Sequence, residues 1–556
     1  MIRTKITSSL ENIFADESFD KYPELTHISA LRGEKISVQL LYSYTSEAEA
    51  IYSFKELSPT ISGSLSKYVR LYEVSHVPVI KPVNKLKYDN EYLRTEPGLF
   101  PDLLSPLDDG ESIFATPENL DSLWFEIAIP EDMAAGEQKL NIALTDKQSG
   151  KVAENVITVE VINALIPEQK LIFTQWFHTD CLASYYNVPV WSKKHWEIIE
   201  NYAKEAVELG INMLLTPVFT PPLDTRIGGE RLTTQLVGVR KEKDKYYFSW
   251  RLLDKWVDMC NKVGIKYLEI SHLFTQWGAT HAPKIMATVD GEYKQIFGWD
   301  TDAHGDEYRI FLRTFLKALL NHMKKRGDDK RCFFHISDEP TAQQLDDYKK
   351  SKSMVEDILS GYTIMDALSD YEFYKMGVVK TPIPSNDNIE PFIENHAQNL
   401  WTYCCSAQCE KVANRLIAMP SWRNRSIGMQ MYKHNIVGFL HWGYNFYYSQ
   451  YSVKEINPYV DLSGNKWVPA GDTFSVYPAK DGTPHPSLRA KVFFDALQDI
   501  RALQLCESLY SHEEVVRAIE DAIGFEVSFD KCATSADEIV RMRDAINSMI
   551  KAKIAK

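Results

Sequence analysis

The sequence lacks the features by which several classes of protein are recognised. Its 556 residues contain no apolar run of about 18 residues, the length that a transmembrane helix needs. The first residues, MIRTKITSSLENIFADESFD, include no apolar stretch of the kind found in signal peptides. Positive charge is scarce, since 62 Lys and Arg residues face 76 Asp and Glu residues and the net charge is −14. An acidic surface disfavours nucleic acids and anionic membranes as partners, so we predict a cytoplasmic protein without either partner.

Cysteine patterns that bind metals are missing as well. None of the eight cysteines forms a C-x-x-C pair. Cys405 and Cys409 are separated by three residues, but no second Cys or His pair completes a zinc site. Most of the cysteines lie in apolar segments, which is typical of free buried thiols in a reducing compartment. We therefore predict no metal site and no cofactor.

Residues 1–165 have the pattern of a β domain. Segments such as KISVQLLYSY (35–44) and ENVITVEVINA (154–164) alternate apolar and polar residues, and helical periodicity is almost absent. This pattern predicts an antiparallel β-sandwich. The segment 95–111, TEPGLFPDLLSPLDDGE, is rich in Pro and Gly and is predicted to be a loop. It is too apolar to be exposed, so we expect it to pack on a neighbouring element.

From residue 166 the pattern changes to short apolar strands that alternate with amphipathic helices. The predicted strands are 171–178, 212–219, 266–274, 332–337, 362–368, 375–382, 399–405 and 438–445. Eight β–α units of this kind indicate a (β/α)8 TIM barrel over residues 166–510. Two further amphipathic helices in residues 511–556 predict a C-terminal helical tail that packs on the barrel.

The fourth predicted strand ends in two adjacent acids, Asp338 and Glu339. In a TIM barrel the catalytic site lies at the C-terminal ends of the strands, and Pro340 ends the strand so that both carboxylates can turn into the cleft. Because adjacent carboxylates repel each other, the more buried one should have a raised pKa and keep a proton near neutrality. A general acid needs this property. The alternative is an acid that only stabilises the N-terminus of the next helix.

Most glycosidases need two carboxylates on opposite sides of the scissile bond. In the commonest barrel arrangement the second acid follows strand seven, but here that strand ends in WTYCCS. A neighbouring carboxylate is poorly placed to attack the opposite face of the sugar. It is well placed to orient a nucleophile that the substrate itself carries, such as the acetamido oxygen of an N-acetylhexosamine. The pattern favours this substrate-assisted mechanism, and a two-carboxylate retaining mechanism stays open if another loop supplies an acid.

Two stretches carry a specific resemblance. The run FFHISDEP (333–340) behind a β-sandwich, and the stretch from GFLHWGYN to DALQDIRAL (438–503), resemble glycoside hydrolase family 123. The second stretch also looks like a C-terminal domain of unknown function that recurs in relatives of that family. The resemblance implies a β-N-acetylgalactosaminidase that works by substrate assistance. It further implies that Glu339 is the general acid/base and that Asp338 orients and stabilises the acetamido group.

Several polar and aromatic side chains near the predicted strand ends are candidates for binding a sugar, since pyranose faces stack on aromatic rings and hydroxyls need polar partners. The candidates are Trp176, His178, His272, His335, Tyr403, Trp442, Tyr444, Asn445 and Asp472. For the aromatic residues, packing in the core is the alternative. Arg489 lies at the start of the last barrel helix, where a cation opposes the helix dipole, so we expect it to have a carboxylate partner.

Two other functions are compatible with parts of the pattern. A metal-dependent hydrolase would use the strand-end histidines, which are His178, His272, His335 and His441. Strand one has no His-x-His pair, however, and no strand carries a Lys that would bridge two metals. A carbohydrate-binding protein without catalysis would have lost one of the two acids, and both are present. We therefore expect a carbohydrate as the substrate.

Overall fold

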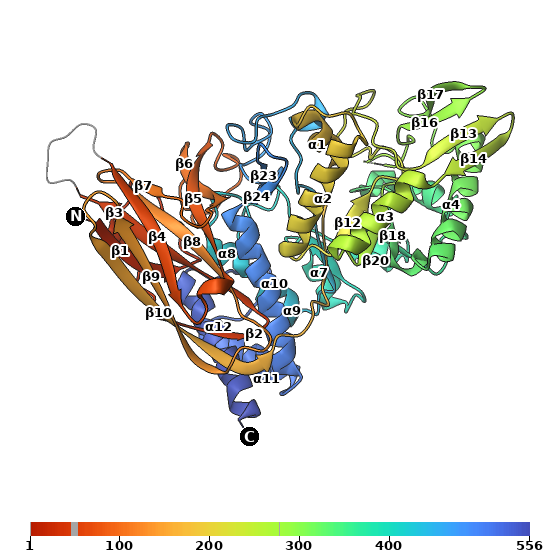
Figure 1. Cartoon of the computed structure of the whole chain (residues 1–556). Helices are drawn as coiled ribbons and strands as arrows, with labels where there is room; N and C mark the ends of the chain where they lie inside the picture. The colour runs from red at the N-terminus through yellow and green to blue at the C-terminus, as the bar shows by residue number, and fades with distance from the viewer. Residues whose placement is uncertain (1, 46–53, 277, 556) are drawn as a thin grey trace.

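The computed structural model describes residues 2–45, 54–276 and 278–555. The molecule is elongated, with the N-terminal sheets at one end, a barrel at the other, and C-terminal helices between and below them (Figure 1). The predicted order of a sheet-rich N-terminal region, a barrel and a helical C-terminus is confirmed at this level.

The N-terminal region contains two five-stranded sheets. The first has the order β1 (Ile2–Ser8), β3 (Lys35–Tyr44), β8 (Leu120–Ala128), β5 (Val69–Val79), β6 (Gly98–Pro106). The second has the order β2 (His27–Arg32), β10 (Val152–Leu165), β9 (Gly136–Asp146), β4 (Lys55–Gly63), β7 (Ile113–Ala115). Alternate residues such as Val38 and Leu40 of the first sheet meet Leu140 and Ile142 of the second in one apolar core. The pairing is antiparallel except between β2 and β10, which are parallel, so the expectation of a purely antiparallel sandwich is wrong at this edge.

The prediction of a loop over residues 95–111 is also wrong in part. Residues 98–106 form β6, an edge strand paired with β5. Pro101 fits there because an edge strand can lack a ladder donor. The segment does pack on a neighbour, as expected, since Leu103 forms an isolated bridge with Ser487 and Asp102 forms an ion pair with Arg489 at 3.2 Å. Arg489 therefore has the predicted carboxylate partner.

Eight parallel strands form a nearly closed barrel, each lying beside the strands that precede and follow it in the chain. They are β11 (Ile172–Gln175), β12 (Met213–Thr216), β15 (Tyr267–Ile270), β18 (Cys332–Phe334), β19 (Thr363–Ala367), β20 (Thr381–Ile383), β21 (Trp401–Tyr403) and β22 (Gly438–His441). Each overlaps one predicted strand. Between β20 and β21 the pairing is a single bridge, Ser385 with Tyr403, beside which the Tyr403 N–H donates to the Pro384 carbonyl oxygen at 3.1 Å. The barrel thus closes through a short, irregular contact.

Helices follow the strands unevenly. They are α1 (Thr179–Tyr185), α2 (Lys193–Glu208), α3 (Arg251–Val263), α4 (Asp306–Arg326), α5 (Leu345–Ser353), α6 (Tyr371–Lys375), α7 (Glu390–Glu394), α8 (Ser421–Arg425), α9 (Ile427–Lys433) and α10 (Leu488–Glu507). After β19 and β20 the helices α6 and α7 have only five residues each. The expected (β/α)8 alternation is therefore realised in part.

Small sheets are inserted in the connections at the C-terminal ends of the barrel strands. Four strands, β13 (Gly238–Glu242), β14 (Lys245–Ser249), β16 (Ile285–Val289) and β17 (Glu292–Phe297), form one sheet. It lies at the end of the molecule remote from the N-terminal sheets (Figure 1). The strands β23 (Val476–Pro478) and β24 (Pro484–Pro486) form a second, two-stranded sheet between β22 and α10.

Helix α10 joins the barrel to the N-terminal sheets. It is buried on every face although it carries several polar residues. Those residues have partners across the contact: Lys491 forms an ion pair with Glu126 at 2.8 Å, and the Gln498 amide bonds both backbone groups of Lys35. Burial of polar groups is tolerated when they are paired in this way.

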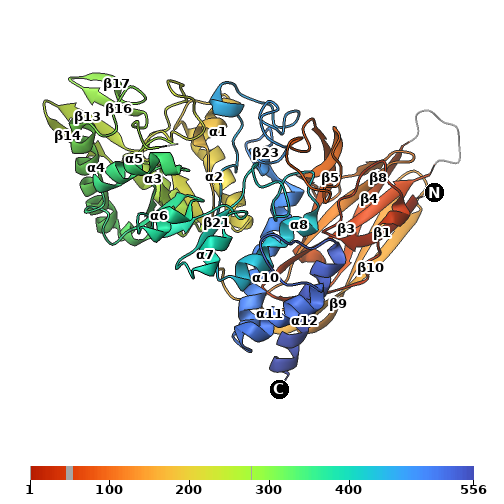
Figure 2. The same ribbon diagram turned by 180° about the vertical axis from the view of Figure 1, so that it is seen from behind.

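The C-terminal tail contains α11 (His512–Ile523) and α12 (Ala536–Ile554), as the sequence predicted. Both helices lie below α10, and α12 lies beside the N-terminal sheets (Figure 2). The tail was expected to pack on the barrel, and the structure shows that α12 also contacts the second sheet. The Arg543 guanidinium bonds both carboxylate oxygens of Glu34 at 2.7 and 2.8 Å, and the Asn547 amide donates to Ser29 Oγ at 2.9 Å.

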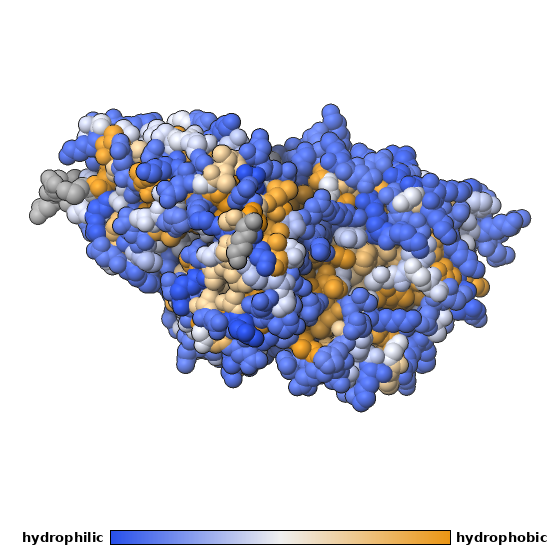
Figure 3. All heavy atoms as spheres, turned by 90° about the horizontal axis from the view of Figure 1, so that it is seen from below, coloured by the Kyte–Doolittle hydropathy of each residue, from blue (hydrophilic) through white to orange (hydrophobic). Residues whose placement is uncertain are grey.

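The surface gives no sign of a spanning segment. In residues 2–45, 54–276 and 278–555 no helix has the length and apolar character needed to cross a membrane. The lower face is mainly hydrophilic, and its hydrophobic residues gather in hollows near the middle and on the barrel side (Figure 3).

We predict that Arg543→Ala destabilises the protein by about 3–5 kcal/mol, because the truncation leaves the Glu34 carboxylate buried without its partner. The urea midpoint of unfolding measures the effect. Arg541→Ala is the matched control, since Arg541 lies on the same helix in an exposed pair with Asp537 and its loss should change stability by less than about 0.5 kcal/mol. Equal effects of the two variants would contradict the importance of the buried pair.

Candidate active site

A pocket of about 200 Å³ lies at the mouth of the barrel, beyond the C-terminal ends of its strands. Six predicted site residues line it: Trp176, Asp338, Glu339, Tyr403, Trp442 and Asp472. The other lining residues are Leu223, Asp224, Gln276, Ala367, Cys405, Ser406, Leu440 and Trp467. The tandem acids and the aromatic residues from β11, β21 and β22 therefore meet in one cavity, although they are far apart in the sequence.

The two acids differ in exposure. Strand β18 ends at Phe334, and the next helical turn starts only at Ala342 with Thr341 as its N-cap. Asp338 is buried and Glu339 is exposed. Glu339 has a φ of 45°, in the left-handed region that few residues with a side chain adopt. The acids thus lie in a turn between strand and helix, and neither occupies the first helical turn.

The backbone of this turn is held by a carboxylate from the neighbouring strand. Asp366 of β19 accepts hydrogen bonds from the N–H groups of Ile336 at 3.0 Å and Ser337 at 3.3 Å. The Tyr348 hydroxyl donates to the other Asp366 oxygen at 2.5 Å. The Asp366 side chain therefore replaces the backbone hydrogen bonds that β19 would make to β18 beyond Phe334, and it fixes the backbone directly before Asp338.

A buried histidine links Asp366 to a second buried acid. The His335 ring bonds Glu269 at 2.8 Å through Nε2 and Asp366 at 3.3 Å through Nδ1. Burial alone would lower the pKa of His335, but its hydrogen bonds to the two carboxylates raise it to about 10. His335 is therefore a cation at neutral pH. Glu269 also accepts a hydrogen bond from Trp176 Nε1 at 2.7 Å. A continuous series of hydrogen bonds therefore connects the pocket wall to the turn that carries the acids.

Asp338 has a raised pKa in the ligand-free protein. Burial, and then the charge of Glu339, raise the pKa of Asp338 to about 8, against a hydrogen bond from Gln276 at 2.6 Å. The Tyr403 hydroxyl donates to Glu339 Oε1 at 2.6 Å. The more buried acid has the raised pKa, as the sequence predicted. That acid is Asp338, whereas the family resemblance assigns the general acid to Glu339.

Three further pocket residues form a connected wall. Trp442 follows β22, and its Nε1 donates to Asp472 at 2.9 Å. Asp472 is buried, and its other oxygen lies 3.5 Å from His441 Nε2. Trp467 packs beside Trp442 with ring centroids 5.5 Å apart. Indole faces beside a carboxylate offer a sugar both a stacking surface and a hydroxyl acceptor.

Five predicted binding residues lie outside the pocket lining. They are His178, His272, His335, Tyr444 and Asn445. The Asn445 side-chain amide accepts a hydrogen bond from the His178 N–H and donates one to the His178 carbonyl oxygen. The Tyr444 hydroxyl donates to the Tyr202 carbonyl oxygen. His272 stacks on His335 with ring centroids 4.3 Å apart, and neither of its ring nitrogens has a hydrogen-bond partner in the described parts of the chain. We assign these residues to the support of the pocket rather than to contact with a sugar.

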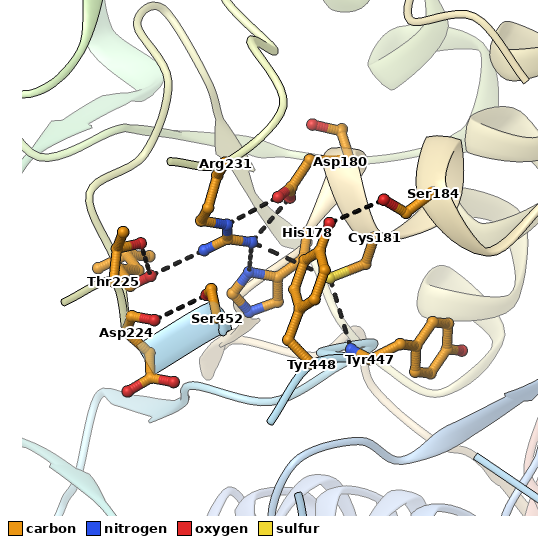
Figure 4. A network of polar contacts seen from close by, with 12 residues as sticks. His178, Asp180, Cys181, Ser184, Asp224, Thr225, Arg231, Tyr447, Tyr448 and Ser452 are labelled. Carbon is orange, nitrogen blue, oxygen red and sulfur yellow. Dashed lines mark hydrogen bonds and ion pairs between the residues drawn. The ribbon is translucent and has the colours of Figure 1, made fainter. Parts of the chain in front are cut away.

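His178 belongs to a network behind the pocket (Figure 4). The Arg231 guanidinium bonds Asp180 through two nitrogens, at 2.7 Å each, and one of them also contacts His178 Nδ1 at 3.3 Å. A third nitrogen donates to the Leu223 carbonyl oxygen at 2.8 Å. The network anchors the loop that brings Asp224 into the pocket.

Asp224, Gln276 and Trp467 are pocket residues that the sequence interpretation missed. All three lie in connections without strand periodicity. A weak signal was present for Asp224, because TPPLDTR directly follows the second predicted strand. The sequence contains no comparable signal for Trp467.

The arrangement does not support the metal-dependent alternative. His178, His272, His335 and His441 bond other side chains or backbone groups or pack against rings, and they share no common centre. Within the described residues no group of three His, Cys, Asp or Glu side chains has a geometry that would hold a metal ion.

A barrel whose C-terminal mouth holds a carboxylate pair between aromatic walls has the site of a glycoside hydrolase. The family model described as "Glycoside hydrolase 123, catalytic domain" matches residues 176–506, more than half of the chain. The chain belongs to glycoside hydrolase family 123. This confirms the resemblance seen in residues 333–340 and 438–503.

Solved structures extend the comparison. A family 123 glycoside hydrolase from Clostridium perfringens, studied for glycolipid glycan hydrolysis, aligns with a TM-score of 0.75 at 15% identity and covers 100% of this chain and 98% of that chain. At this identity the likeness shows the fold alone. A β-glucuronidase from Parabacteroides merdae covers 87% of this chain and 50% of that chain at 10% identity, with a TM-score of only 0.30. No curated protein sequence matches the chain.

We predict that Asp366→Ala lowers kcat by about 10²-fold, since a displacement of the catalytic turn by about 1 Å has an effect of that size. Asp366→Asn keeps an oxygen that accepts from Ile336 and Ser337, so it should recover part of the loss. Steady-state kinetics on a cleavable glycoside measures both variants. Asp370→Ala is the control, because it removes only the N-cap of α6 and should leave kcat unchanged. Equal loss in the Ala and Asn variants would contradict the anchoring role.

Proposed function

We propose that the enzyme removes β-linked N-acetylhexosamine, with N-acetylgalactosamine as the preferred sugar, by substrate-assisted catalysis that retains configuration. The observation that carries the proposal is the Asp338–Glu339 pair in a pocket where the end of β21 contributes Tyr403 in place of an acid. Substrate assistance is the known exception to the two-carboxylate rule. Family membership supports hydrolysis of a glycoside, and the resemblance supplies the choice of sugar.

In the first step the acetamido carbonyl oxygen attacks the anomeric carbon as the glycosidic bond breaks. Glu339 gives its proton to the leaving oxygen, and an oxazolinium ion forms. Asp338 accepts the amide N–H and offsets the developing positive charge, as preorganised groups in a dry site do. In the second step the Glu339 carboxylate takes a proton from water. The water oxygen attacks the anomeric carbon, the ring of the intermediate opens, and both carboxylates return to their starting state.

The raised pKa of Asp338 requires a proton shift when substrate binds. At neutral pH Asp338 holds a proton, because burial and the charge of Glu339 raise its pKa to about 8. An amide N–H donated to Asp338 favours its carboxylate form. We propose that the proton then resides on Glu339, which the Tyr403 hydroxyl holds at the mouth of the pocket. The same hydroxyl is available to the acetamido oxygen once substrate displaces Glu339 from it.

The remaining pocket residues fit sugar binding. Trp176 and Trp442 offer stacking surfaces, and Asp472 accepts hydrogen bonds from hydroxyls. The relative from Clostridium perfringens hydrolyses glycolipid glycans, so a terminal sugar on such a glycan is one candidate substrate. All eight cysteines are unpaired, which supports the proposed cytoplasmic location.

A two-carboxylate retaining mechanism is the second candidate. The observation that favours it is the presence of Asp224 and Asp472 in the same pocket as Asp338 and Glu339. Either residue would be the nucleophile if the bound sugar placed its anomeric carbon between that residue and Glu339.

We predict that Glu339→Gln reduces turnover of substrates with poor leaving groups by about 10²–10⁴-fold, since the amide keeps the shape of the side chain but cannot protonate the leaving oxygen. Aryl glycosides with good leaving groups need less protonation and should be affected less. The ratio of kcat/KM values for the two substrate types, measured in both proteins, tests the assignment. Near wild-type rates on the unactivated substrate would remove Glu339 from the acid role.

The two candidate mechanisms differ in whether an enzyme–sugar bond forms. Substrate assistance predicts no covalent adduct with a 2-fluoro glycosyl trap, and it predicts that a thiazoline mimic of the oxazolinium ion binds more tightly than the product sugar. Asp338→Ala should lower kcat on acetamido substrates by the equivalent of about 3–4 kcal/mol. Intact-mass spectrometry and inhibition kinetics measure these outcomes. A stable adduct on Asp224 or Asp472 without thiazoline inhibition would establish the two-carboxylate alternative instead.

A further inference from the structure

We propose that the pocket selects an uncharged terminal sugar and excludes sugars that carry a sulfate or a carboxylate, and that Asp224 is a specificity-determining residue for this choice. The inference rests on the proposed function only in that it treats this pocket as the place where the terminal sugar binds. It does not depend on which of the two candidate mechanisms operates.

The lining of the pocket is charged with one sign. Its four acidic side chains are those of Asp224, Asp338, Glu339 and Asp472, and no Lys, Arg or His stands among its described lining residues. Two of the four form the proposed catalytic pair, so Asp224 and Asp472 are additional. A site that had to hold a sulfate or uronate would need Arg, Lys or several N–H donors facing it.

No Lys or Arg in the described structure forms an ion pair with Asp472. It is 1% exposed, and its Oδ1 has no hydrogen-bond partner in the described structure. His441 lies 3.5 Å away, but burial lowers the pKa of His441 to about 4 and the ring is neutral. The Arg415 guanidinium bonds Gln175, and it acts on Asp472 only through its charge. The Arg489 guanidinium bonds Asp102 and two backbone carbonyl oxygens. Both groups lie outside the pocket lining.

Asp224 is fixed in place by its surroundings. Its backbone has a φ of 38°, its carbonyl oxygen accepts from Ser452 Oγ at 2.7 Å, and its Oδ2 accepts from the Tyr451 N–H at 3.0 Å. Figure 4 shows the Asp224 carboxylate pointing away from Arg231, whose guanidinium is bonded to Asp180. The nearby cation therefore anchors the loop and does not form an ion pair with Asp224.

The consequence for a ligand follows from charge and hydrogen bonding. Sugar hydroxyls donate to carboxylates in strong, charge-assisted bonds, so a neutral sugar gains from each acid. A sulfate has only acceptor oxygens. It would face the carboxylates of Asp224 and Asp472 and a catalytic pair of which one member is protonated, with no cation among the described lining residues. Such like-charge contacts weaken binding by about 10²-fold or more.

The test compares a neutral aryl N-acetyl-β-galactosaminide with its 4-O-sulfated and 6-O-sulfated forms. We expect kcat/KM for the wild-type enzyme to be lower by about 10²-fold or more for both sulfated forms. Asp224→Asn removes one charge and keeps the shape of the side chain. It should therefore reduce the ratio of kcat/KM for the neutral substrate to kcat/KM for at least one sulfated substrate by about tenfold. Asp290→Asn is the matched control. Asp290 also has a left-handed φ, of 50°, but is exposed in the turn between β16 and β17, and its replacement should leave the ratio unchanged.

Calorimetric binding of N-acetylgalactosamine and its sulfates repeats the comparison without turnover, so a loss of catalysis in Asp224→Asn does not obscure the result. Sulfated and neutral sugars that react and bind within about threefold of each other would overturn the proposal, and so would equal ratios in Asp224→Asn and Asp290→Asn. Failure of the proposed function gives a different result, namely no cleavage of any N-acetylhexosaminide. In that case the charge selection is tested by comparing the binding and cleavage of a neutral galactoside with those of the corresponding galacturonide.

Discussion

The geometry of the turn that carries Asp338 and Glu339 depends on three ionisable side chains buried inside the barrel. His335 is held between Glu269 and Asp366, and all three are almost completely buried. Buried charges are tolerated only when their partners satisfy them well. Glu269 also accepts from Trp176, and Asp366 accepts from Tyr348 and from the backbone of the turn. Moving the turn would therefore leave a charge or an N–H group unpaired, and this cost keeps the acids where they are.

The same chain of contacts explains how a short strand supports two adjacent acids of different character. Strand β18 stops pairing with β19 at Phe334, and the Asp366 side chain continues the hydrogen bonding that the strand gives up. The chain can then turn, so that Asp338 enters the buried side of the pocket and Glu339 its open side. Burial gives Asp338 a distinct character, since desolvation raises the pKa of this enclosed carboxyl group.

The N-terminal sheets and the C-terminal tail enclose the last barrel helix. Helix α10 has no exposed face of its own. Its Lys491 pairs with Glu126 of the N-terminal region, and its Asp499 pairs with Arg425 of α8 and Arg543 of the tail. Its Arg489 bonds Asp102 of β6 and the carbonyl oxygens of Gly471 and Phe474. The connection that carries Asp472 is thus fixed by a strand of the N-terminal sheet, so the wall of the pocket depends on a region remote in the sequence.

The sequence by itself determined the eight barrel strands, the two helices of the tail and the location of the tandem acids at a strand end. These features can be predicted from local hydrophobic periodicity and from Pro340, which ends a strand. It also identified Trp176, Tyr403, Trp442 and Asp472 as residues near the mouth. Only the tertiary structure decided that His335 faces inward beneath the acids and that Asp224 and Gln276 enter the pocket from two different loops. Along a strand, adjacent side chains point to opposite faces. An error of one residue in the predicted strand end therefore moves a side chain from the pocket to the core. A loop residue has no such period, and its position follows from distant partners, as Arg231 and Asp180 show for Asp224.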